Sequence, residues 1–438
     1  MSVVVLGSGY VVEPCVNYLH KKNYKVTIIS RTIKPHLKKY GTCISHDLQD
    51  LQGLKQYVKD ADLIVSLVPY TLHAEVIKIA IELKKHVVTT SYINPQMAEL
   101  DQQCKDNNLI CMNEIGMDPG IDHLYAVDVI DQVRQKNGKI DHFTSYCGGL
   151  PSPENSDNAL GYKFSWSARG VLLALKNDAK YWENGKLVEI KGKDLMKSAT
   201  VIDTPYPSFR FVGYGNRDSS IYKERYNIPE AQSCVRGSMR YWVFPIVMDA
   251  FNEIGLLSLD PLKTDATTWK GLMQFVLNAD ASDDLFAILI KKANVTKPEN
   301  IKVLRDAVSW LGLFNDSKLP KVEPLTLLDY LTKLFQSKME YEKGERDMVF
   351  LIHKFDISYP NGKKERRFYT LIDYGTEEAS SMAKLVGVPC AVAVEMILKK
   401  EITKTGVFGP LTVDLARPLM AKLEALGIKM KEHILELQ

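Results

Sequence analysis

The pattern of residues 3–32 constrains the fold of this chain more than any other feature. An apolar run at residues 3–6 meets a tight turn that contains Gly7, Ser8 and Gly9. A stretch with helical spacing follows, and a second apolar run occupies residues 26–29. Strand, glycine turn, helix and strand form the opening βαβ unit of a dinucleotide-binding fold, in which the pyrophosphate lies at the helix N-terminus.

The glycine pattern is incomplete, because Val12 stands where the usual G-x-G-x-x-G motif has its third glycine. Two glycines at this spacing also occur in ordinary loops. The flanking strands favour the dinucleotide interpretation, as does Pro14, since the first turn of a helix tolerates proline.

The end of the second strand indicates which dinucleotide is bound. An NAD site places Asp or Glu there to bind the ribose 2′-hydroxyl. This chain has Ser30, Arg31 and Thr32 instead, and two hydroxyls with a cation suit the 2′-phosphate of NADP(H). The alternative is that Arg31 is an ordinary solvated arginine.

Strands and helices continue to alternate through the first third of the chain. We predict strands at residues 62–67, 86–89 and 109–112, and helices at residues 73–83 and 95–107. This alternation is typical of an α/β protein with a doubly wound parallel sheet. Ligands of such sheets bind beyond the carboxyl ends of the strands, which are followed here by residues 68–70, 90–92 and 113–120.

The character of the sequence changes near residue 121. A predicted strand at residues 139–146 leads into Cys147 and two glycines, and a long loop-rich stretch follows. Long irregular loops inside a compact protein are usually functional. Residues 265–345 have mainly helical spacing and indicate a small separate bundle.

The last third of the chain predicts a hairpin and a long helix. Asn361 and Gly362 form the strongest short turn signal and separate predicted strands at residues 348–357 and 366–372. Residues 381–399 predict an apolar helix that returns to pack on the first domain.

The overall composition limits the classes of function. A chain of 438 residues holds two or three domains, and a net charge of +3 without a basic block does not indicate nucleic-acid binding. The N-terminus lacks the layout of a signal peptide, and no apolar stretch approaches the ~20 residues of a membrane span. Seven cysteines without a CxxC pair and nine histidines without HxH or HExxH spacing predict neither a disulfide framework nor a metal site. We therefore expect a cytoplasmic protein that binds neither nucleic acid nor a membrane.

Three side chains at predicted strand ends are candidates for acid–base chemistry. Asp118, which precedes Pro119, is a candidate acid/base or amine partner, and the alternative is a turn or cap aspartate. Tyr92 could present its phenol to a nicotinamide or simply be packed. Cys147 could be a thiol acid/base, although a buried inert cysteine is the commoner case.

Two arginines lie in predicted loops beside glycines and hydroxyls. Arg217 follows Gly215 and Asn216, and Arg240 follows Ser238 and Met239. The fork of arginine binds carboxylates through two hydrogen bonds, which favours a carboxylate pocket. The alternative is an ordinary surface ion pair.

Several stretches between residues 6 and 393 resemble, in order, the saccharopine reductase family, the NADP-dependent, L-glutamate-forming saccharopine dehydrogenases. They include LGSGYVVEP, KKHVVTTSYINPQM, NEIGMDPGIDHLYA, SYCGGLPSPENSDNALGYKFSWS, GNRDSSIYKERY and RGSMRYWVFP. Loop segments of this length are far more specific than a glycine pattern.

The resemblance implies three structural units and a homodimer. It implies an NADP-binding Rossmann domain at residues 1–120, completed by about residues 385–438. It further implies a mixed α/β substrate-binding and dimerisation domain at residues 121–384, with a small all-helical domain at residues 265–345 inserted within it.

The resemblance also implies the reaction. L-Glutamate and L-α-aminoadipate 6-semialdehyde would be joined with NADPH to give saccharopine, reversibly, in the penultimate step of lysine biosynthesis by the aminoadipate route. In animals a similar domain is fused to a second enzyme. Because this chain begins at its dinucleotide fold, we expect the free-standing, biosynthetic form.

The resemblance assigns roles to individual residues. The implied cofactor residues are Gly7, Ser8, Gly9, Tyr10, Val11, Val12, Ser30, Arg31, Thr32, Asp47, Val68, Tyr70, His73, Thr90, Ser91, Met117, Asp118, Pro119 and Ser167. The implied substrate residues are Ser91, Tyr92, Asp118, Arg217, Ser238, Met239 and Arg240. The family often has proline at position 215 and Thr-Leu at positions 238 and 239, so fine positioning differs here while the hydroxyl and both arginines are kept.

The catalytic candidates are Asp118, Tyr92 and Cys147, and which of them acts as acid or base stays open. Two other functions also stay open. One is a related reductive condensation with a polyamine, of the carboxynorspermidine type, whose substrate would favour acids over paired arginines. The other is a catalytically silent NADP-binding module.

Overall fold

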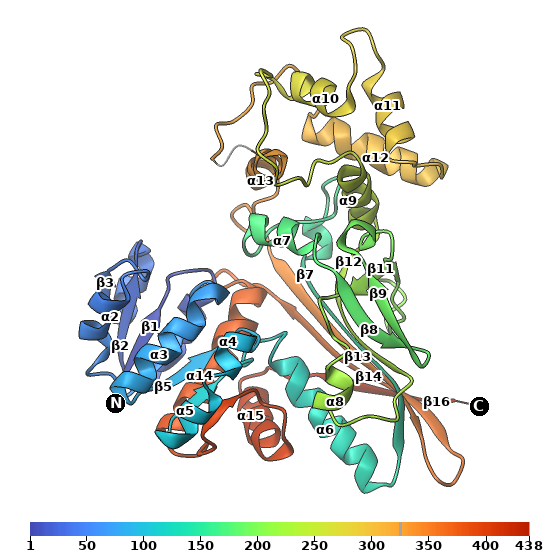
Figure 1. The fold of residues 1–438 in the computed structure, drawn as a ribbon. Coiled ribbons are helices and arrows are strands. Elements are labelled where there is room, and N and C mark those ends of the chain that lie inside the picture. The colour runs from blue at the N-terminus through green and yellow to red at the C-terminus, as the bar shows by residue number, and fades with distance from the viewer. Residues whose placement is uncertain (324–325, 438) are drawn as a thin grey trace.

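Two β-sheets and a cluster of helices make up the computed structural model, which describes residues 1–323 and 326–437 (Figure 1). The first sheet has seven strands in the order β15-β6-β5-β4-β1-β2-β3, and every neighbouring pair is parallel. Its strands are β1 (Ser2–Leu6), β2 (Lys25–Ser30), β3 (Thr42–Ser45), β4 (Leu63–Ser66), β5 (His86–Thr89), β6 (Ile110–Met112) and β15 (Gly406–Phe408). The predicted doubly wound parallel sheet is therefore confirmed.

Helices cover both faces of this sheet because its central strands are apolar on both sides. Val3 and Val5 face a core that includes α1, whereas Val4 and Leu6 face a second core that includes α2 and α3. The helices that connect these strands are α1 (Val12–Lys21), α2 (Leu51–Val58), α3 (His73–Leu83), α4 (Pro95–Ala98) and α5 (Asp101–Asp106). Short 3₁₀ turns occur at η1 (Pro35–Tyr40), η2 (Tyr70–Leu72), η3 (Pro153–Asn155) and η4 (Gly192–Asp194).

The single helix predicted at residues 95–107 is wrong, since the structure has two short helices there. The backbone N–H of Leu100 donates to the carbonyl of Met97 at 3.1 Å, one residue short of the α-helical partner. That tight turn buries both side chains against the sheet and separates α4 from α5. The pattern also missed the edge strand β3, whose four residues lack an apolar run.

The second sheet has nine strands and curves beside the first. Its main path is β10-β11-β12-β7-β13-β14-β16, and β8 and β9 extend it from β12. Its strands are β7 (Lys139–Pro151), β8 (Ala179–Glu183), β9 (Lys186–Ile190), β10 (Thr200–Val201), β11 (Phe211–Gly215), β12 (Ser233–Tyr241), β13 (Asp347–Ser358), β14 (Lys364–Tyr374) and β16 (Lys431–Leu437). β7 is longer than predicted and carries Cys147 within the strand. The predicted hairpin is confirmed, because β13 and β14 pair antiparallel across the Asn361-Gly362 turn.

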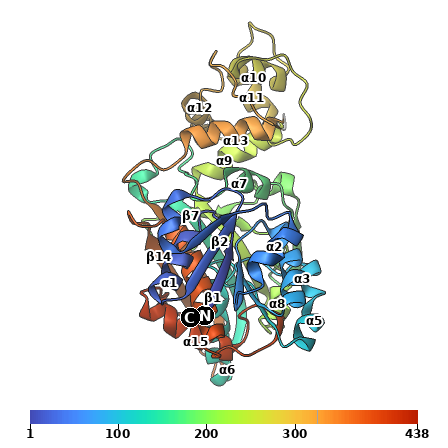
Figure 2. The ribbon, with the colours of Figure 1, turned by 90° about the vertical axis from the view of Figure 1, so that its left-hand side faces the viewer.

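Helices α6 (Ile121–Gln135), α7 (Ala168–Ala174), α8 (Tyr222–Arg225) and α9 (Val243–Glu253) accompany the second sheet. Four more helices, α10 (Trp269–Leu277), α11 (Leu285–Lys292), α12 (Pro298–Leu311) and α13 (Leu327–Lys338), form the cluster at the top of Figures 1 and 2, away from the first sheet. They share a continuous apolar core with α7 and α9.

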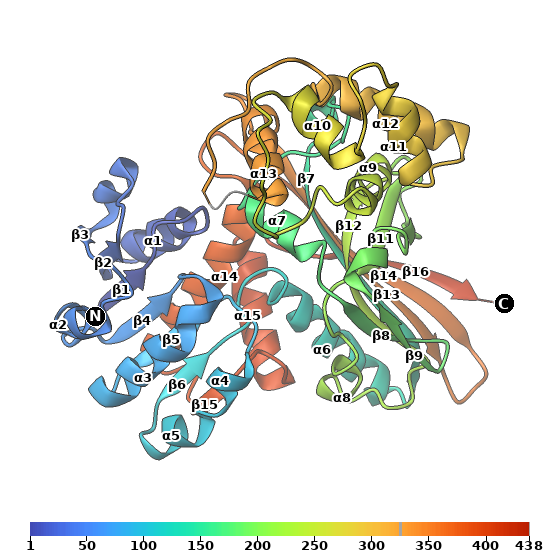
Figure 3. The ribbon, with the colours of Figure 1, turned by 45° about the horizontal axis from the view of Figure 1, so that its top comes forward.

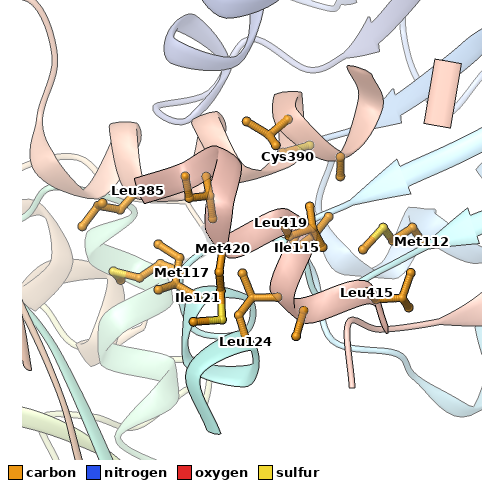
Figure 4. Close-up of a cluster of buried hydrophobic side chains, with 14 of the residues drawn as sticks. Met112, Ile115, Met117, Ile121, Leu124, Leu385, Cys390, Leu415, Leu419 and Met420 are labelled. Atoms are coloured by element: carbon orange, nitrogen blue, oxygen red, sulfur yellow. The ribbon is translucent and has the colours of Figure 1, made fainter. Parts of the chain in front are cut away.

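The C-terminal segment joins the two sheets. Helix α14 (Ser381–Leu398) contacts β4 and β5 of the first sheet and β13 of the second, and α15 (Val413–Ala425) packs on α6. In Figure 3, α14 lies between the strands of the two sheets. Figure 4 shows the apolar contact that results, between Leu385, Cys390, Leu415, Leu419 and Met420 on one side and Met112, Ile115, Met117, Ile121 and Leu124 on the other. After α15, β16 becomes the edge of the second sheet, so the last segment contributes to both sheets.

Helix α14 also qualifies one expectation from the sequence. By length and composition it is apolar enough to cross a membrane, although no apolar stretch was expected to reach that length. Most of the helix is buried inside the protein, which is the arrangement of a core helix.

Gly387 of α14 takes over the packing role of the missing third glycine. A Cβ atom at Gly387 would lie 2.5 Å from the carbonyl oxygen of Val11 and 3.0 Å from the amide nitrogen of Cys15. The backbone of α14 therefore approaches the first turn of α1 closely, and Val12 is accommodated as a fully buried core residue.

We expect Gly387→Val to push α14 away from α1. The overpacked side chain should lower the free energy of unfolding by about 1–3 kcal/mol and weaken NADPH binding, because the first turn of α1 moves. Urea unfolding and fluorescence titration with NADPH measure the two effects. The control is Gly271→Ala in α10, where the nearest atom to an added Cβ is Thr268 Oγ1 at 3.3 Å; unchanged NADPH binding in Gly387→Val would contradict the expectation.

Candidate active site

A cavity of about 340 Å³ lies where the carboxyl ends of the first sheet face the second sheet. Residues from both sheets and from α14 line it, including Val11, Tyr92, Met117, Asp118, Cys147, Trp166, Tyr214, Arg217, Ser238, Arg240, Met382 and Val386. The structure thus brings all three catalytic candidates and both candidate arginines to one cavity. Adjacent carboxyl ends explain the meeting of Tyr92 and Asp118, since β5 and β6 are neighbouring strands.

Asp118 and Tyr92 are joined by a hydrogen bond at the floor of this cavity. The Tyr92 hydroxyl donates to Asp118 Oδ1 at 2.8 Å. Arg236 Nη2, from β12, donates to the same Asp118 oxygen at 2.6 Å and to the Tyr92 hydroxyl at 3.3 Å. Burial raises the pKa of the Tyr92 phenol well above its ordinary value, so Tyr92 keeps its proton.

Arg236 also binds a second carboxylate, that of Asp122 at the start of α6. Burial raises the pKa of the Asp118 carboxyl above its usual range, against the opposing charge of Arg236. Burial would raise the pKa of Asp122 as well, but Arg236 and His123 lower it below its usual range. The two neighbouring carboxyls therefore differ in proton affinity, which is the arrangement that separates an acid/base group from a permanent anion.

Cys147 faces the cavity from β7. Its Sγ lies 4.0 Å from Met117 Sδ, and burial raises the pKa of its thiol well above the ordinary value. The side chain therefore carries a protonated thiol rather than a nucleophilic thiolate.

Arg240 is a buried cation, 8% exposed, that projects into the cavity from β12. Its Nη1 donates to the carbonyl oxygen of Met239 at 2.6 Å, and its guanidinium lies near the rings of Tyr162, Tyr214 and Phe244. Within residues 1–323 and 326–437 it has no carboxylate partner, and its Nε has no hydrogen bond. A buried charge without a counter-ion is costly, so this cavity favours an anionic ligand.

Arg217 also lines the cavity, just after β11, and is exposed. Its backbone is left-handed, with φ +54°, and its carbonyl oxygen accepts from the amide of Lys180 at 2.9 Å. A left-handed arginine is uncommon and is held by surrounding structure. Ser238 also lines the cavity, whereas the Met239 side chain is fully buried in the apolar core behind β12.

The glycine turn fits a dinucleotide. Gly7 has φ +115°, and a Cβ there would lie 2.6 Å from the carbonyl oxygen of Leu67, whereas a Cβ at Gly9 would meet nothing within 4 Å. Gly7 therefore serves the turn, and Gly9 leaves open space above it. Helix α1 begins after Val11 without a side-chain cap. The Val12 amide donates to the carbonyl oxygen of Gly9 at 3.3 Å and Pro14 has no N–H, so the Glu13 amide is the one in this first turn that is left for a phosphate.

The end of β2 is tied to this turn. Ser8 Oγ donates to the carbonyl oxygen of Thr32 at 2.6 Å and is hydrogen-bonded to Ser30 Oγ at 3.0 Å. Arg31 between them is exposed, and Ser45 Oγ donates to its carbonyl oxygen at 3.0 Å. The loop thus fixes the backbone of Arg31 while leaving its guanidinium free to reach a 2′-phosphate.

His73 is held away from solvent beneath the strand ends. Its ring nitrogens hydrogen-bond to Ser66 Oγ at 2.9 Å and to Ser91 Oγ at 2.7 Å. Burial lowers the pKa of His73 to about 4, so it is a neutral ring that fixes Ser91 rather than an exposed ligand. Thr90 is half-buried beside Ser91.

The other implied cofactor residues border the same edge of the first sheet. Tyr70 is exposed and Val68 is buried after β4, while Asp47 is exposed and accepts from the Gln49 amide. Tyr10 and Ser167 meet at a second cavity of about 350 Å³, which shares Trp166 with the first. Ser167 also caps α7 by accepting from the Gly170 amide.

The sequence patterns did not reveal a buried polar network that lies behind Asp118. Arg236, Asp122, His123 and Glu114 were not singled out, although the quoted segments contain them. Glu114 accepts from His123 Nε2 at 3.1 Å and from both terminal nitrogens of Arg225, at 3.2 and 2.8 Å. Among the described residues, no group of three or more His, Cys, Asp or Glu side chains is arranged to hold a metal ion.

Family comparisons cover nearly the whole chain. The model described as "Saccharopine dehydrogenase NADP binding domain" matches residues 3–112, and that described as "Saccharopine dehydrogenase C-terminal domain" matches residues 116–428. A protein of Pyricularia oryzae, "Saccharopine dehydrogenase [NADP(+), L-glutamate-forming]", is 46% identical over 99% of both chains. The protein of the same name from Saccharomyces cerevisiae is 42% identical over 98% of both chains.

Solved structures agree with the sequence comparison. The apo saccharopine dehydrogenase (L-Glu forming) of Saccharomyces cerevisiae superposes with a TM-score of 0.92 at 41% identity, over 99% of both chains. The homospermidine synthase of Legionella pneumophila covers 99% of this chain with a TM-score of 0.57 and 11% identity, which shows a shared fold alone.

We expect Arg31→Ala to weaken NADPH binding about 10- to 100-fold, since a charge-assisted hydrogen bond contributes about 1.5–3 kcal/mol. Binding of NADH, which has no 2′-phosphate, should change little. Fluorescence titration with each nucleotide measures both affinities. Lys38→Ala removes an exposed positive charge from the neighbouring η1 turn and is the control for net charge; an equal loss for NADPH and NADH in Arg31→Ala would exclude a 2′-phosphate role.

Proposed function

Because this chain belongs to the saccharopine dehydrogenase family, we propose that it joins L-glutamate to L-α-aminoadipate 6-semialdehyde with NADPH, giving saccharopine reversibly. This reaction is the penultimate step of lysine biosynthesis by the aminoadipate route. Relatives that are 42–46% identical over nearly their whole length carry the name of the L-glutamate-forming enzyme. Both halves of the chain match domains of that family.

The observation that carries the proposal is the unpaired, buried Arg240 in the cavity that also holds Asp118 and Tyr92. Both substrates are carboxylates, and saccharopine carries three carboxyl groups. Arg240 and Arg217 offer two separate cationic positions at the same cavity. Arginine binds carboxylates through its planar fork, so each position suits one end of a dicarboxylic amino acid.

NADPH, when bound at the Gly7–Val12 turn, supplies the hydride that reduces the imine of the two substrates. The residues that hold it include Ser8, Ser30, Arg31 and Thr32. The glycine turn leaves open space at Gly9, and no carboxylate occurs at the end of β2 to repel a 2′-phosphate.

The chain's own residues then supply proton transfer. The glutamate amine attacks the aldehyde carbon to form a carbinolamine, which loses water as an imine forms. Asp118 carries a proton more readily than an ordinary aspartate and can protonate the leaving hydroxyl. Tyr92 keeps its own proton and donates to Asp118 at 2.8 Å, which orients that carboxyl. In the reverse direction Asp118 accepts a proton from the attacking water.

Positioning contributes alongside proton transfer. Both substrates carry carboxylates, whose like charges repel when the two molecules are brought together, and Arg217 and Arg240 at the cavity offset that repulsion. A polyamine substrate would be repelled by the same two cations, which argues against the carboxynorspermidine-type alternative. The retained Asp118, Tyr92 and cavity argue against a silent nucleotide-binding module.

NADPH absorbance with purified protein tests the proposal. We expect oxidation of NADPH when glutamate and α-aminoadipate semialdehyde are supplied together and none with either alone. No oxidation with both substrates, despite measurable NADPH binding, would contradict the proposal. Oxidation with a diamine in place of glutamate would favour the polyamine reaction.

Variants of the two arginines test substrate recognition. We expect Arg217→Ala and Arg240→Met each to raise the KM for glutamate or for saccharopine by at least about tenfold, since each loses a charge-assisted pair. The NADPH affinity should stay unchanged. Arg210→Ala is the control for Arg217→Ala, because Arg210 is also exposed and lies near the same sheet but not at the cavity. Unchanged KM and kcat in Arg217→Ala would remove that residue from the site.

The protein is further proposed to act as a homodimer in the cytoplasm. The exposed side chains of Ile434 and Leu435 on the edge strand β16 support a contact at that edge, since unpaired apolar edges are usually covered. Seven cysteines without disulfide spacing support a reducing compartment. Light scattering of the purified protein and fractionation of cells test these two points.

A further inference from the structure

One guanidinium serves two carboxylates behind the cavity. Arg236 Nη2 donates to Asp118 Oδ1 at 2.6 Å and also to Asp122 Oδ2. Asp122 is fully buried and is fixed by the Gly120 amide, which donates to its Oδ1 at 2.6 Å. Neither Arg236 nor Asp122 lines the cavity, whereas Asp118 does.

The aromatic rings around Arg236 hold it in this place. Its guanidinium lies 4.2 Å from the centre of the Tyr222 ring and 5.5 Å from that of Tyr92. Arg236 is 4% exposed and cannot turn towards solvent for another partner. Its backbone lies within β12 and pairs with Ser145 of β7, and its carbonyl oxygen accepts from the amide of Asn216 at 3.0 Å, so the position is rigid.

The titratable and charged groups near Asp118 come from every element packed around it. Besides Arg236, they comprise Tyr92 after β5, Asp122 and His123 of α6, Cys147 of β7, Tyr222 of α8 and Arg240 of β12. His353 of β13 lies beyond Asp122 and is fully buried. Of these groups, only Arg236 and Tyr92 hydrogen-bond to Asp118.

We propose that Arg236 and Asp122 are positioning residues that set the charge of Asp118, by dividing one buried guanidinium between two carboxyl groups. The inference rests on the proposed role of Asp118 as the acid/base group of the condensation. Asp122 keeps its negative charge because it accepts hydrogen bonds from Arg236 and from a backbone amide and lies beside His123. Asp118 receives only a share of the positive charge and faces a permanent anion, so it retains a proton to higher pH than an isolated Asp–Arg pair would.

This arrangement predicts that removing the charge of Asp122 and removing the charge of Arg236 have opposite effects on the pH at which Asp118 loses its proton. Without the Asp122 charge, Arg236 compensates Asp118 alone, and Asp118 loses its proton at lower pH. Without the Arg236 charge, two carboxyl groups face each other in a buried site, and Asp118 retains its proton to higher pH. If Arg236 and Asp122 merely supported the fold, the two variants would shift the pH dependence in the same direction or would not shift it at all.

The test is the pH profile of kcat/KM for oxidation of saccharopine by the purified enzyme with NADP. This rate falls at low pH when the required base becomes protonated. We expect Asp122→Asn to move the acidic limb to lower pH and Arg236→Gln to move it to higher pH, each by about one unit or more. Arg236→Lys keeps the charge and should leave the limb near its wild-type position while lowering kcat.

Arg367→Gln is the matched control. Arg367 is a similarly buried arginine of the same sheet, 5% exposed, and pairs with the buried Glu365 on β14 rather than with a cavity residue. We expect its pH profile to equal that of the wild type even where its thermal stability is lower. Thermal melts with and without NADPH show which variants are folded, and Arg236→Lys and Asp122→Asn keep the test valid if Arg236→Gln does not fold.

Asp118→Asn separates this inference from the proposed function. If Asp118→Asn abolishes the acidic limb, and Asp122→Asn and Arg236→Gln shift it in opposite directions, the inference stands. If Asp118→Asn abolishes the limb but the other two variants shift it together or not at all, the inference is overturned and the role of Asp118 remains. If the limb persists in Asp118→Asn, Asp118 is not the titrating base. The inference and the acid/base role of Asp118 are then both overturned, while oxidation of saccharopine by the enzyme still supports the proposed reaction.

Discussion

The burial of α14 between the two sheets is the contact on which the rest of the structure depends. The helix is apolar around most of its circumference, and it fills the space beside β4 and β5 on one side and β13 on the other. Burial of apolar surface on this scale is the dominant favourable contribution to folding. Because α14 packs on both sheets at once, it fixes the distance between the carboxyl edge of the first sheet and the face of the second. That distance is the width of the cavity.

Electrostatics then determines what the cavity accepts. The two buried cations of β12 are not balanced in the same way: Arg236, behind the cavity, is shared by Asp118 and Asp122, whereas Arg240, in the cavity wall, has a carbonyl oxygen and aromatic rings around it. The first arrangement tunes an acid, and the second leaves a positive charge for the substrate to neutralise. Both charges come from β12, where residues 236, 238 and 240 alternate onto one face of the strand. A single strand thus carries a tuning group, a hydroxyl and an anion-binding group in succession.

The sequence predicted what is local and missed what is built across long separations. The strand–turn–helix at residues 3–32 and the hairpin at Asn361-Gly362 follow from neighbouring residues, and both are confirmed. The meeting of Tyr92 and Asp118 could be predicted because ligand sites of parallel sheets lie at adjacent strand ends. Arg236 could not be, since it reaches Asp118 from another sheet, 118 positions along the chain. The compensation of Val12 by Gly387 was equally invisible, because it joins α1 to a helix near the opposite end of the sequence.

The place of α14 in the chain has a consequence for how the protein is made. The glycine turn before α1 leaves the ribosome long before the helix α14 that covers α1 and the strand β15 that completes its sheet. The apolar faces of α1 and β6 therefore stay uncovered until α14 and β15 have been synthesised. Sheets that depend on such distant pairings fold slowly and expose aggregation-prone surface meanwhile. Co-translational folding of the first sheet therefore stops short of a finished site until α14 and β15 have emerged, and the nascent chain needs protection from aggregation until then.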